Sequence, residues 1–133
     1  MVDSFSKDTR IKDAPGWFNE AKNNGYLAGD GYKWRWWKGQ GGFIDYTNPE
    51  ALRWWQGLQR PILEMGIDGW KLDGTATFFT SKLGNLPIPY QHTYDGLKTT
   101  RQYMNYYYRK EYEFGKSINP EFVTLSRSID RLY

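Results

Sequence analysis

The sequence predicts an α/β fold in which short parallel strands alternate with helices. Two observations predict it. The helix-start signal Asn48-Pro49-Glu50 is followed by apolar residues at helical spacing and then by a short strand, Ile67–Leu72, which ends at Asp73-Gly74. A second strand, Phe122–Leu125, follows a further helical stretch. Strands separated by helices at this spacing favour a parallel sheet.

The N-terminal third predicts one short helix between loops. Residues 1–15 are polar and show no pattern, so we expect a loop there. A helix is expected from Pro15 to Tyr26, closed by Gly25. Residues 28–42 contain five glycines and three tryptophans, which predict a long loop, and Phe43–Asp45 is expected to be a short strand.

The central helix has the clearest local signals. Asn48 can accept backbone N–H groups, proline suits the first turn, and a glutamate there suits the helix dipole. Pro61 is expected to bend or break the helix. Its apolar residues recur at helical spacing: Leu52, Trp55, Leu58 and Ile62.

The C-terminal half predicts a loop, a helix and a strand. Residues 74–93 contain Pro87 and Pro89 and are expected to form a loop. A long helix is expected from about Tyr94 to Lys116, before a turn and the second strand.

The strand that ends at Asp73 carries charges where an ordinary core strand has none. Side chains alternate along a strand, so Ile67, Gly69, Lys71 and Asp73 share one face. A cation and an anion on one face are costly to bury in an apolar core. In a β/α barrel, a carboxylate at the C-terminal end of a strand indicates catalysis. The alternative is a structural aspartate in the turn before Gly74.

The neighbouring motifs, in order, form a recognisable set: Trp37-Lys38-Gly39, Phe43-Ile44-Asp45-Tyr46-Thr47-Asn48-Pro49-Glu50, Trp54-Trp55, Gly66-Ile67-Asp68-Gly69-Trp70-Lys71-Leu72-Asp73-Gly74 and Leu125-Ser126-Arg127-Ser128. This order and spacing resemble the central part of the glycoside hydrolase family 31 barrel, the α-glucosidase, α-xylosidase and α-galactosidase group. The resemblance covers roughly residues 16–128. A (β/α)₈ barrel needs about 250 residues, so residues 1–133 are expected to be a fragment of that catalytic domain, a partial TIM barrel.

The resemblance implies a retaining glycoside hydrolase acting on α-glycosidic bonds. Asp73 corresponds to the family's nucleophile, which forms a covalent glycosyl–enzyme. A second carboxylic acid, about 5–5.5 Å away in retaining enzymes, protonates the leaving oxygen and then activates water. The family's acid/base is an aspartate in a later Trp-x-Gly-Asp type of segment, which we expect beyond the C-terminus of this chain. This chemistry implies no cofactor or metal.

Two positions depart from the family pattern. Lys38 replaces the usual proline after Trp37, and Ala76 stands where many members carry a glutamate. Asp130 is a poor substitute for the acid/base, because it lies only three residues past Arg127.

Four further residues are candidates for substrate binding, each with a structural alternative. Arg127 follows a strand and could bind sugar hydroxyls or hold a carboxylate, or form a structural ion pair. Trp37 could form a wall against a sugar ring, or pack within its loop. Asp45 could bind hydroxyls or hydrogen-bond the following turn. Lys71 could keep the Asp73 carboxylate ionised, or form a salt bridge inside the barrel.

Composition agrees with a carbohydrate substrate without establishing one. Aromatic residues make up 19% of the chain, with seven Trp and eleven Tyr, although many are expected in the core. A non-catalytic carbohydrate-binding unit is therefore the alternative to an enzyme. The net charge of +3 is scattered, which argues against a nucleic-acid partner.

Targeting and assembly signals are few in this chain. No apolar run approaches the ~20 residues of a membrane span, which argues against a membrane partner. No apolar signal-peptide core is visible, and the natural N-terminus is expected upstream. There is no cysteine, and a lone His92 with no clustered ligands predicts no metal site. Oligomeric state and localisation are not predicted.

Overall fold

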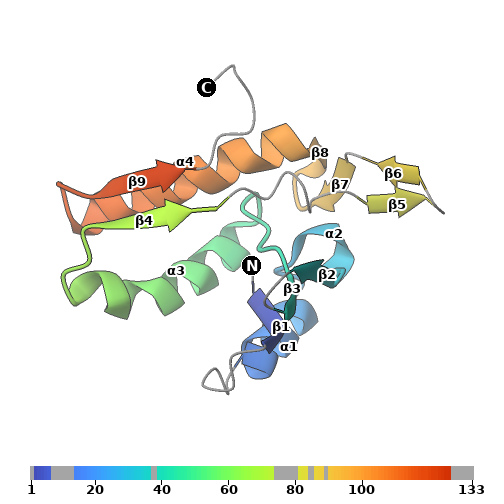
Figure 1. Ribbon diagram of the computed structural model, residues 1–133, viewed down its shortest axis with the longest axis horizontal. Coiled ribbons are helices and arrows are strands. Elements are labelled where there is room, and N and C mark those ends of the chain that lie inside the picture. The colour runs from blue at the N-terminus through green and yellow to red at the C-terminus, as the bar shows by residue number, and fades with distance from the viewer. Residues whose placement is uncertain are drawn as a thin grey trace.

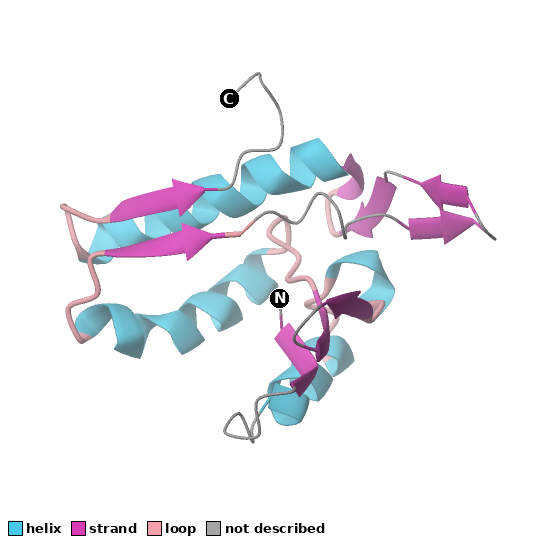
Figure 2. Ribbon diagram, viewed as in Figure 1, coloured by secondary structure: helices cyan, strands magenta, loops and turns pink. Residues whose placement is uncertain are grey.

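The computed structural model describes residues 2–6, 14–36, 39–73, 81–83, 86–88 and 90–126. Figure 1 labels the elements in these ranges and Figure 2 separates helices from strands. In chain order they are β1 (Val2–Ser6), α1 (Ala14–Asn23), α2 (Ala28–Gly31), β2 (Trp34–Trp36), β3 (Gly39–Gly42), α3 (Pro49–Glu64), β4 (Gly69–Leu72), β5 (Ser81–Leu83), β6 (Leu86–Ile88), β7 (Tyr90–Thr93), β8 (Gly96–Thr99), α4 (Thr100–Ile118) and β9 (Val123–Ser126).

The centre of the molecule is a parallel pair of strands, β4 and β9, joined through α4. Gly69 pairs with Val123 and Leu72 with Ser126, so the predicted parallel arrangement is confirmed. Helices α3 and α4 run alongside this pair (Figure 1). The helix-facing core here contains three buried side chains, flanked by Trp70 and Ile118: Leu63, Phe114 and Phe122. Within the described residues the strands form no closed barrel.

A second core joins the N-terminal elements to the start of α4. Antiparallel strands in the order β1-β3-β2 form a small sheet. Tyr103 of α4 is 1% exposed and its hydroxyl donates to the carbonyl oxygen of Ile44 at 2.8 Å. This bond ties α4 to the segment that leads into α3. The buried members of this core are Phe18, Ala21, Leu27, Ala28, Trp34, Phe43, Ile44, Tyr46, Ala51 and Tyr103.

Helix α3 begins where the sequence predicts. The Asn48 side chain accepts from the backbone N–H of Glu50 at 2.9 Å and of Ala51 at 3.4 Å. Of the bend or break expected at Pro61, the break is wrong, because the helix continues to Glu64. Proline removes the bond to the carbonyl of Gly57, four residues earlier. Both residues are exposed, so water can satisfy that carbonyl in the last turns of the helix.

The N-terminal loops predicted from composition are partly strands. Residues 2–6 form β1, and the predicted long loop at 28–42 contains α2, β2 and β3. The predicted strand Phe43–Asp45 is wrong, because Ile44 makes only an isolated bridge with Leu27. The glycine-rich β3 owes its strand conformation to pairing on both sides with distant segments. A local pattern does not reveal such pairing.

The region before α4 also differs from the prediction. In place of a loop at 74–93, the described residues form β5, β6 and β7, and β8 occupies the expected first turn of the helix. The helix begins at Thr100 instead of Tyr94 because Thr99 and Gln102 form a reciprocal capping box. Gly96, with φ of 80°, supplies the turn between β7 and β8.

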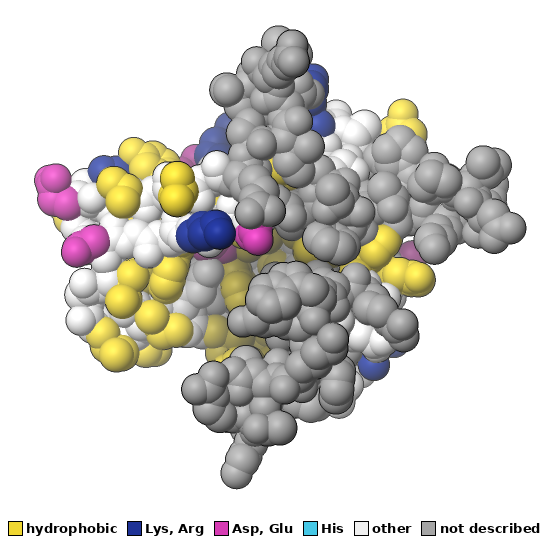
Figure 3. All heavy atoms as spheres, viewed as in Figure 1, with side chains coloured by type: hydrophobic (Ala, Val, Ile, Leu, Met, Phe, Trp, Pro, Cys, Tyr) yellow, Lys and Arg dark blue, Asp and Glu magenta, His cyan; other side chains and the backbone are white. Residues whose placement is uncertain are grey.

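Figure 3 shows hydrophobic side chains gathered over α3 and the β4–β9 pair on the face toward the viewer. Large apolar residues of this region are well exposed: Met65 81%, Leu125 70%, Val123 62%, Ile62 45% and Ile67 38%. Among the helices that the structure describes, none is long and apolar enough to cross a membrane.

Candidate functional site

Asp73 directly follows β4, at the C-terminal end of the parallel pair. Lys71 and Asp73 are exposed, whereas Leu72 between them is 4% exposed. The alternation that the sequence predicts is therefore present, with the two charged side chains on the open face. The Asp73 carboxylate is thus exposed at the strand end where a β/α barrel holds its chemistry.

Two of the predicted site residues lie outside the described residues. β9 ends at Ser126, paired with Leu72, so the chain leaves β9 at the same edge of the sheet where Asp73 leaves β4. Arg127 comes next in the sequence, but neither it nor Trp37 is described. Their roles remain predictions, as does the distance of Arg127 from Asp73. Asp130 is also outside the described residues.

A cavity of about 270 Å³ lies next to β4. Its lining comes from β4, α3, α4 and the turn before α3. Aromatic rings and one carboxylate make up most of the wall. The lining residues are Tyr46, Trp55, Gln59, Trp70, Lys71, Leu72, Tyr107 and Glu111.

Glu111 on α4 is the main polar residue of this cavity that sequence reasoning missed. Its side chain is 3% exposed. One carboxylate oxygen, Oε1, accepts from the Tyr46 hydroxyl at 2.5 Å and from the Trp55 Nε1–H at 2.8 Å. The other, Oε2, accepts from the Gln59 Nε2–H at 2.8 Å. A sequence signal existed, because Tyr103, Tyr107 and Glu111 follow at i, i+4 and i+8, which places an acid on the apolar stripe of the helix.

Three tyrosines around Glu111 are held in the neutral form. Burial is the main cause that raises the pKa of Tyr46, with the nearby charge of Glu111 second. Burial likewise raises the pKa of Tyr103 well above its ordinary value. Burial also raises the pKa of Tyr107, followed by the charges of Glu111, Tyr108 and Asp73. Tyr107 therefore lies within electrostatic reach of both Glu111 and Asp73.

Asp45 is 3% exposed, and both its carboxylate oxygens accept hydrogen bonds from the protein. Oδ1 accepts from Thr47, at 2.9 Å from the backbone N–H and 2.6 Å from the hydroxyl. Oδ2 accepts from the backbone N–H of Tyr94 at 2.6 Å. The hydrogen bond to the following turn, one of the two predicted roles, is thus present. Contact of Asp45 with a sugar remains a prediction.

A second cavity, of about 210 Å³, lies beside Asp45. His92 is exposed at this cavity. Within the ranges that the structure describes, no three His, Cys, Asp or Glu side chains gather in a group that could hold a metal ion.

Comparison with known proteins gives a match over nearly the whole chain. Residues 3–129 match the sequence model described as the glycosyl hydrolases family 31 TIM-barrel domain. The α-xylosidase XylQ of Lactiplantibacillus pentosus is 43% identical over 60 residues, which are 42% of this chain and 8% of that protein.

Solved structures are also similar to this chain over most of its length. The cycloalternan-forming enzyme of Listeria monocytogenes, in complex with a pentasaccharide substrate, superposes with a TM-score of 0.70 at 28% identity, covering 96% of this chain and 12% of the enzyme. A GH31 dextranase of Flavobacterium johnsoniae, complexed with isomaltotriose, has a TM-score of 0.71 at 21% identity, covering 88% of this chain and 16% of its own. The chain thus spans less than a fifth of each of these proteins.

Proposed function

Because the chain belongs to glycosyl hydrolase family 31 and matches its TIM-barrel domain, we propose that it supplies the nucleophile strand of a retaining glycosidase acting on α-glycosidic bonds. The observation that carries the proposal is Asp73, an exposed carboxylate at the C-terminal end of a parallel strand. Catalytic residues of TIM barrels stand at that end of the strands. The described part of the chain is a partial barrel.

In the proposed reaction, an Asp73 oxygen attacks the anomeric carbon and forms a C–O bond as the glycosidic C–O bond breaks. A second carboxylic acid gives its proton to the leaving oxygen. The same group then takes a proton from water, which attacks the anomeric carbon and releases Asp73 with retained configuration. We assign this acid/base to a residue outside the 133 residues, as the resemblance implies.

Substrate contacts are proposed for four residues besides the nucleophile: Trp37, Asp45, Lys71 and Arg127. Lys71 shares the exposed face of β4 with Asp73, so we assign its ammonium group a contact with the substrate beside the nucleophile. Asp45 accepts three hydrogen bonds from the protein, and a carboxylate has about four acceptor positions, so it keeps capacity to accept from one sugar hydroxyl while it holds the following turn. The relatives include an α-xylosidase and an enzyme in complex with a pentasaccharide substrate, which supports a glycoside or oligosaccharide as the substrate.

The first experiment tests Asp73 without the acid/base. A glycosyl fluoride with a second fluorine on the ring needs little protonation of its leaving group, and its glycosyl–enzyme hydrolyses slowly. We expect mass spectrometry to find one added sugar on the Asp73 peptide, and none in Asp73→Asn. Sugar binding with an unmodified Asp73 peptide would instead support the alternative, a non-catalytic carbohydrate-binding unit.

The second experiment tests the missing acid/base. We expect the 133-residue chain not to hydrolyse aryl α-glycosides, because general acid–base assistance contributes about 10²–10⁴-fold. The loss should be larger, since much of the wall that positions the sugar is also absent. Robust turnover that disappears in Asp73→Ala would show that an acid/base lies within the chain, and Asp130 would be the first residue to mutate.

A further inference from the structure

The buried carboxylate of Glu111 joins three segments of the protein. It belongs to α4, and it accepts hydrogen bonds from Tyr46 in the turn before α3 and from Trp55 and Gln59 on α3. A buried charge is costly unless it is hydrogen-bonded, and hydrogen bonds to a charged group are among the stronger ones. The three donors therefore have one favourable arrangement around this carboxylate.

These hydrogen bonds hold the Asp45–Asn48 turn in place. The turn contains Asp45, one of the residues proposed to contact the substrate. Tyr46 follows Asp45, whose carboxylate holds the backbone N–H of Thr47 and Tyr94. Asn48, two residues further on, caps α3. A shift of Tyr46 would therefore move the Asp45 carboxylate and the first turn of α3 together. The hydrogen bond from Tyr46 to Glu111 sets this turn against α4.

Glu111 also shares a cavity with β4, the strand that leads to Asp73. Glu111, Lys71 and Leu72 line one cavity. Tyr107, one helical turn before Glu111, is close enough to both Glu111 and Asp73 for their charges to raise its pKa further after burial. Trp70 of β4 also packs against the core cluster that contains Phe114 of α4, so α4 supports the strand that leads to Asp73.

We propose that Glu111 is a positioning residue, which fixes the Asp45–Asn48 turn and the C-terminal end of β4 relative to each other. Its role in the reaction rests on the function proposed above. Glu111 does not touch substrate in this assignment. It acts through Tyr46 on the turn and through α4 on β4.

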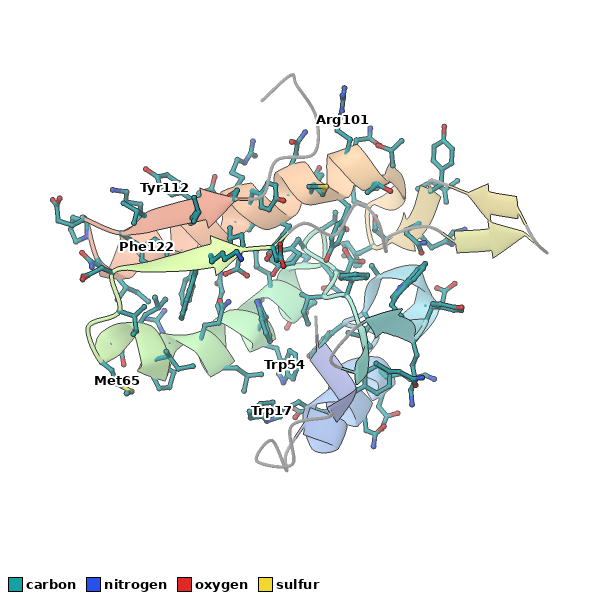
Figure 4. The ribbon with its side chains drawn as sticks, in the orientation of Figure 1. Trp17, Trp54, Met65, Arg101, Tyr112 and Phe122 are labelled. Carbon is teal, nitrogen blue, oxygen red and sulfur yellow. The ribbon has the colours of Figure 1, made fainter. Side chains whose placement is uncertain are left out.

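Two adjacent tryptophans of α3 provide a matched pair of variants. Trp55 donates to the buried Glu111 at 2.8 Å, whereas Trp54 donates to Glu20 of α1 at 2.9 Å in an exposed bond. Figure 4 shows Trp54 on the part of α3 near α1. Replacing each by phenylalanine removes one indole N–H and one bond to a carboxylate. Only Trp55→Phe removes a hydrogen bond to Glu111.

Glu111→Gln separates charge from hydrogen bonding. The amide oxygen introduced at position 111 can still accept from Tyr46 and Trp55. The introduced amide nitrogen would face the Gln59 nitrogen, but Gln59 can turn its amide over. The buried Oε1 of Gln59 has no hydrogen-bond partner among the described residues. After the Gln59 amide flips, this oxygen would accept from the amide nitrogen introduced at position 111. Glu111→Gln should therefore preserve the arrangement that Glu111→Leu removes.

The measurements are hydrogen exchange and labelling of Asp73 by the activated glycosyl fluoride. In Trp55→Phe and Glu111→Leu we expect amides of residues 45–48 and 70–73 to exchange at least about tenfold faster. The limiting labelling rate should fall about 10- to 100-fold, the range that a misplacement of about 1 Å can cost, with the half-saturating reagent concentration little changed. Trp54→Phe and Glu111→Gln should stay within about twofold of the wild type.

The outcomes separate the two proposals. Equal effects of Trp55→Phe and Trp54→Phe on exchange would overturn the positioning role, as would Glu111→Gln behaving like Glu111→Leu. If Glu111→Leu does not fold, Tyr46→Phe takes its place. This variant removes a single donor to Glu111 and should give the same faster exchange and slower labelling. An unlabelled wild-type chain would count against Asp73 as nucleophile, while exchange in the two segments would still decide whether Glu111 fixes them.

Discussion

Gly115→Ala should destabilise the fold, because Gly115 is where α4 meets the residue before β9. Gly115 is buried in the helix, and an added Cβ would lie within 2.5 Å of Phe122 Cζ and closer still to two other ring atoms. Phe122 is 0% exposed and its ring meets Trp70 edge-on, with centroids 6.1 Å apart. Figure 4 labels Phe122 at this junction. The ring has no solvent-filled space into which it can move.

The size of the effect follows from two opposing contributions. Alanine gains about 1 kcal/mol over glycine inside a helix. Overpacking a core typically costs about 1–3 kcal/mol, and overlap with three ring atoms places this case at the upper end. The free energy of unfolding should therefore fall by about 2 kcal/mol.

The matched control is Gly57→Ala in α3. A Cβ at Gly57 would meet nothing within 4 Å. Only the helix-propensity gain of roughly 0.5–1 kcal/mol remains. Urea unfolding followed by circular dichroism should thus show changes of opposite sign for the two variants. Phe122→Leu should partly restore stability in the Gly115→Ala background, since the smaller side chain leaves room for the methyl group.

A stabilising effect of Gly115→Ala equal to that of Gly57→Ala would refute the packing of α4 on Phe122. A destabilisation that Phe122→Leu does not relieve would place the strain elsewhere.

Two further predictions concern pH and helix capping. The raised pKa values of Tyr46, Tyr103 and Tyr107 mean that the unfolded chain loses protons near pH 10 while the folded chain retains them. Stability should be unaffected by these groups below pH 10 and fall above it by up to about 1.4 kcal/mol per pH unit for each tyrosine. Tyr107→Phe should reduce that slope in urea titrations between pH 10 and 11, and an unchanged slope would contradict its burial as a neutral group. Asn48→Ala should lower the free energy of unfolding by about 1 kcal/mol and Asn48→Asp by much less, and equal losses in the two variants would show that the cap bonds contribute little.

Local signals predicted the part of the fold that carries Asp73. The Asn48 cap, the apolar spacing of α3 and the alternation around Lys71 lie within a few residues of the elements that they define. The Thr99–Gln102 pair was also in the sequence, and it would have moved the predicted start of α4 from Tyr94 to the observed position. Caps of this kind depend only on neighbouring backbone.

Pairing between distant segments could not be predicted in the same way. β3 is a run of glycines and glutamine whose partners lie at residues 2–6 and 34–36. The donors to Glu111 come from positions 52 to 65 residues away. A helical acid among aromatics indicates that something must pair with it, but not which residues do so.

The β4–β9 pair has a consequence for how the chain folds. Gly69 of β4 pairs directly with Val123 of β9, so the two strands are neighbours in their sheet although they lie far apart in the sequence. Pairing these strands closes the chain segment that joins them. The entropic cost of closure grows as about 1.5 RT times the logarithm of the number of residues in the segment, and the pairing returns free energy only after closure. Parallel pairs of high sequence separation therefore form late. We expect α4, with its local capping box, to form first and to deliver β9 to β4, so that the carboxylate at position 73 reaches its final surroundings only in the last step of folding.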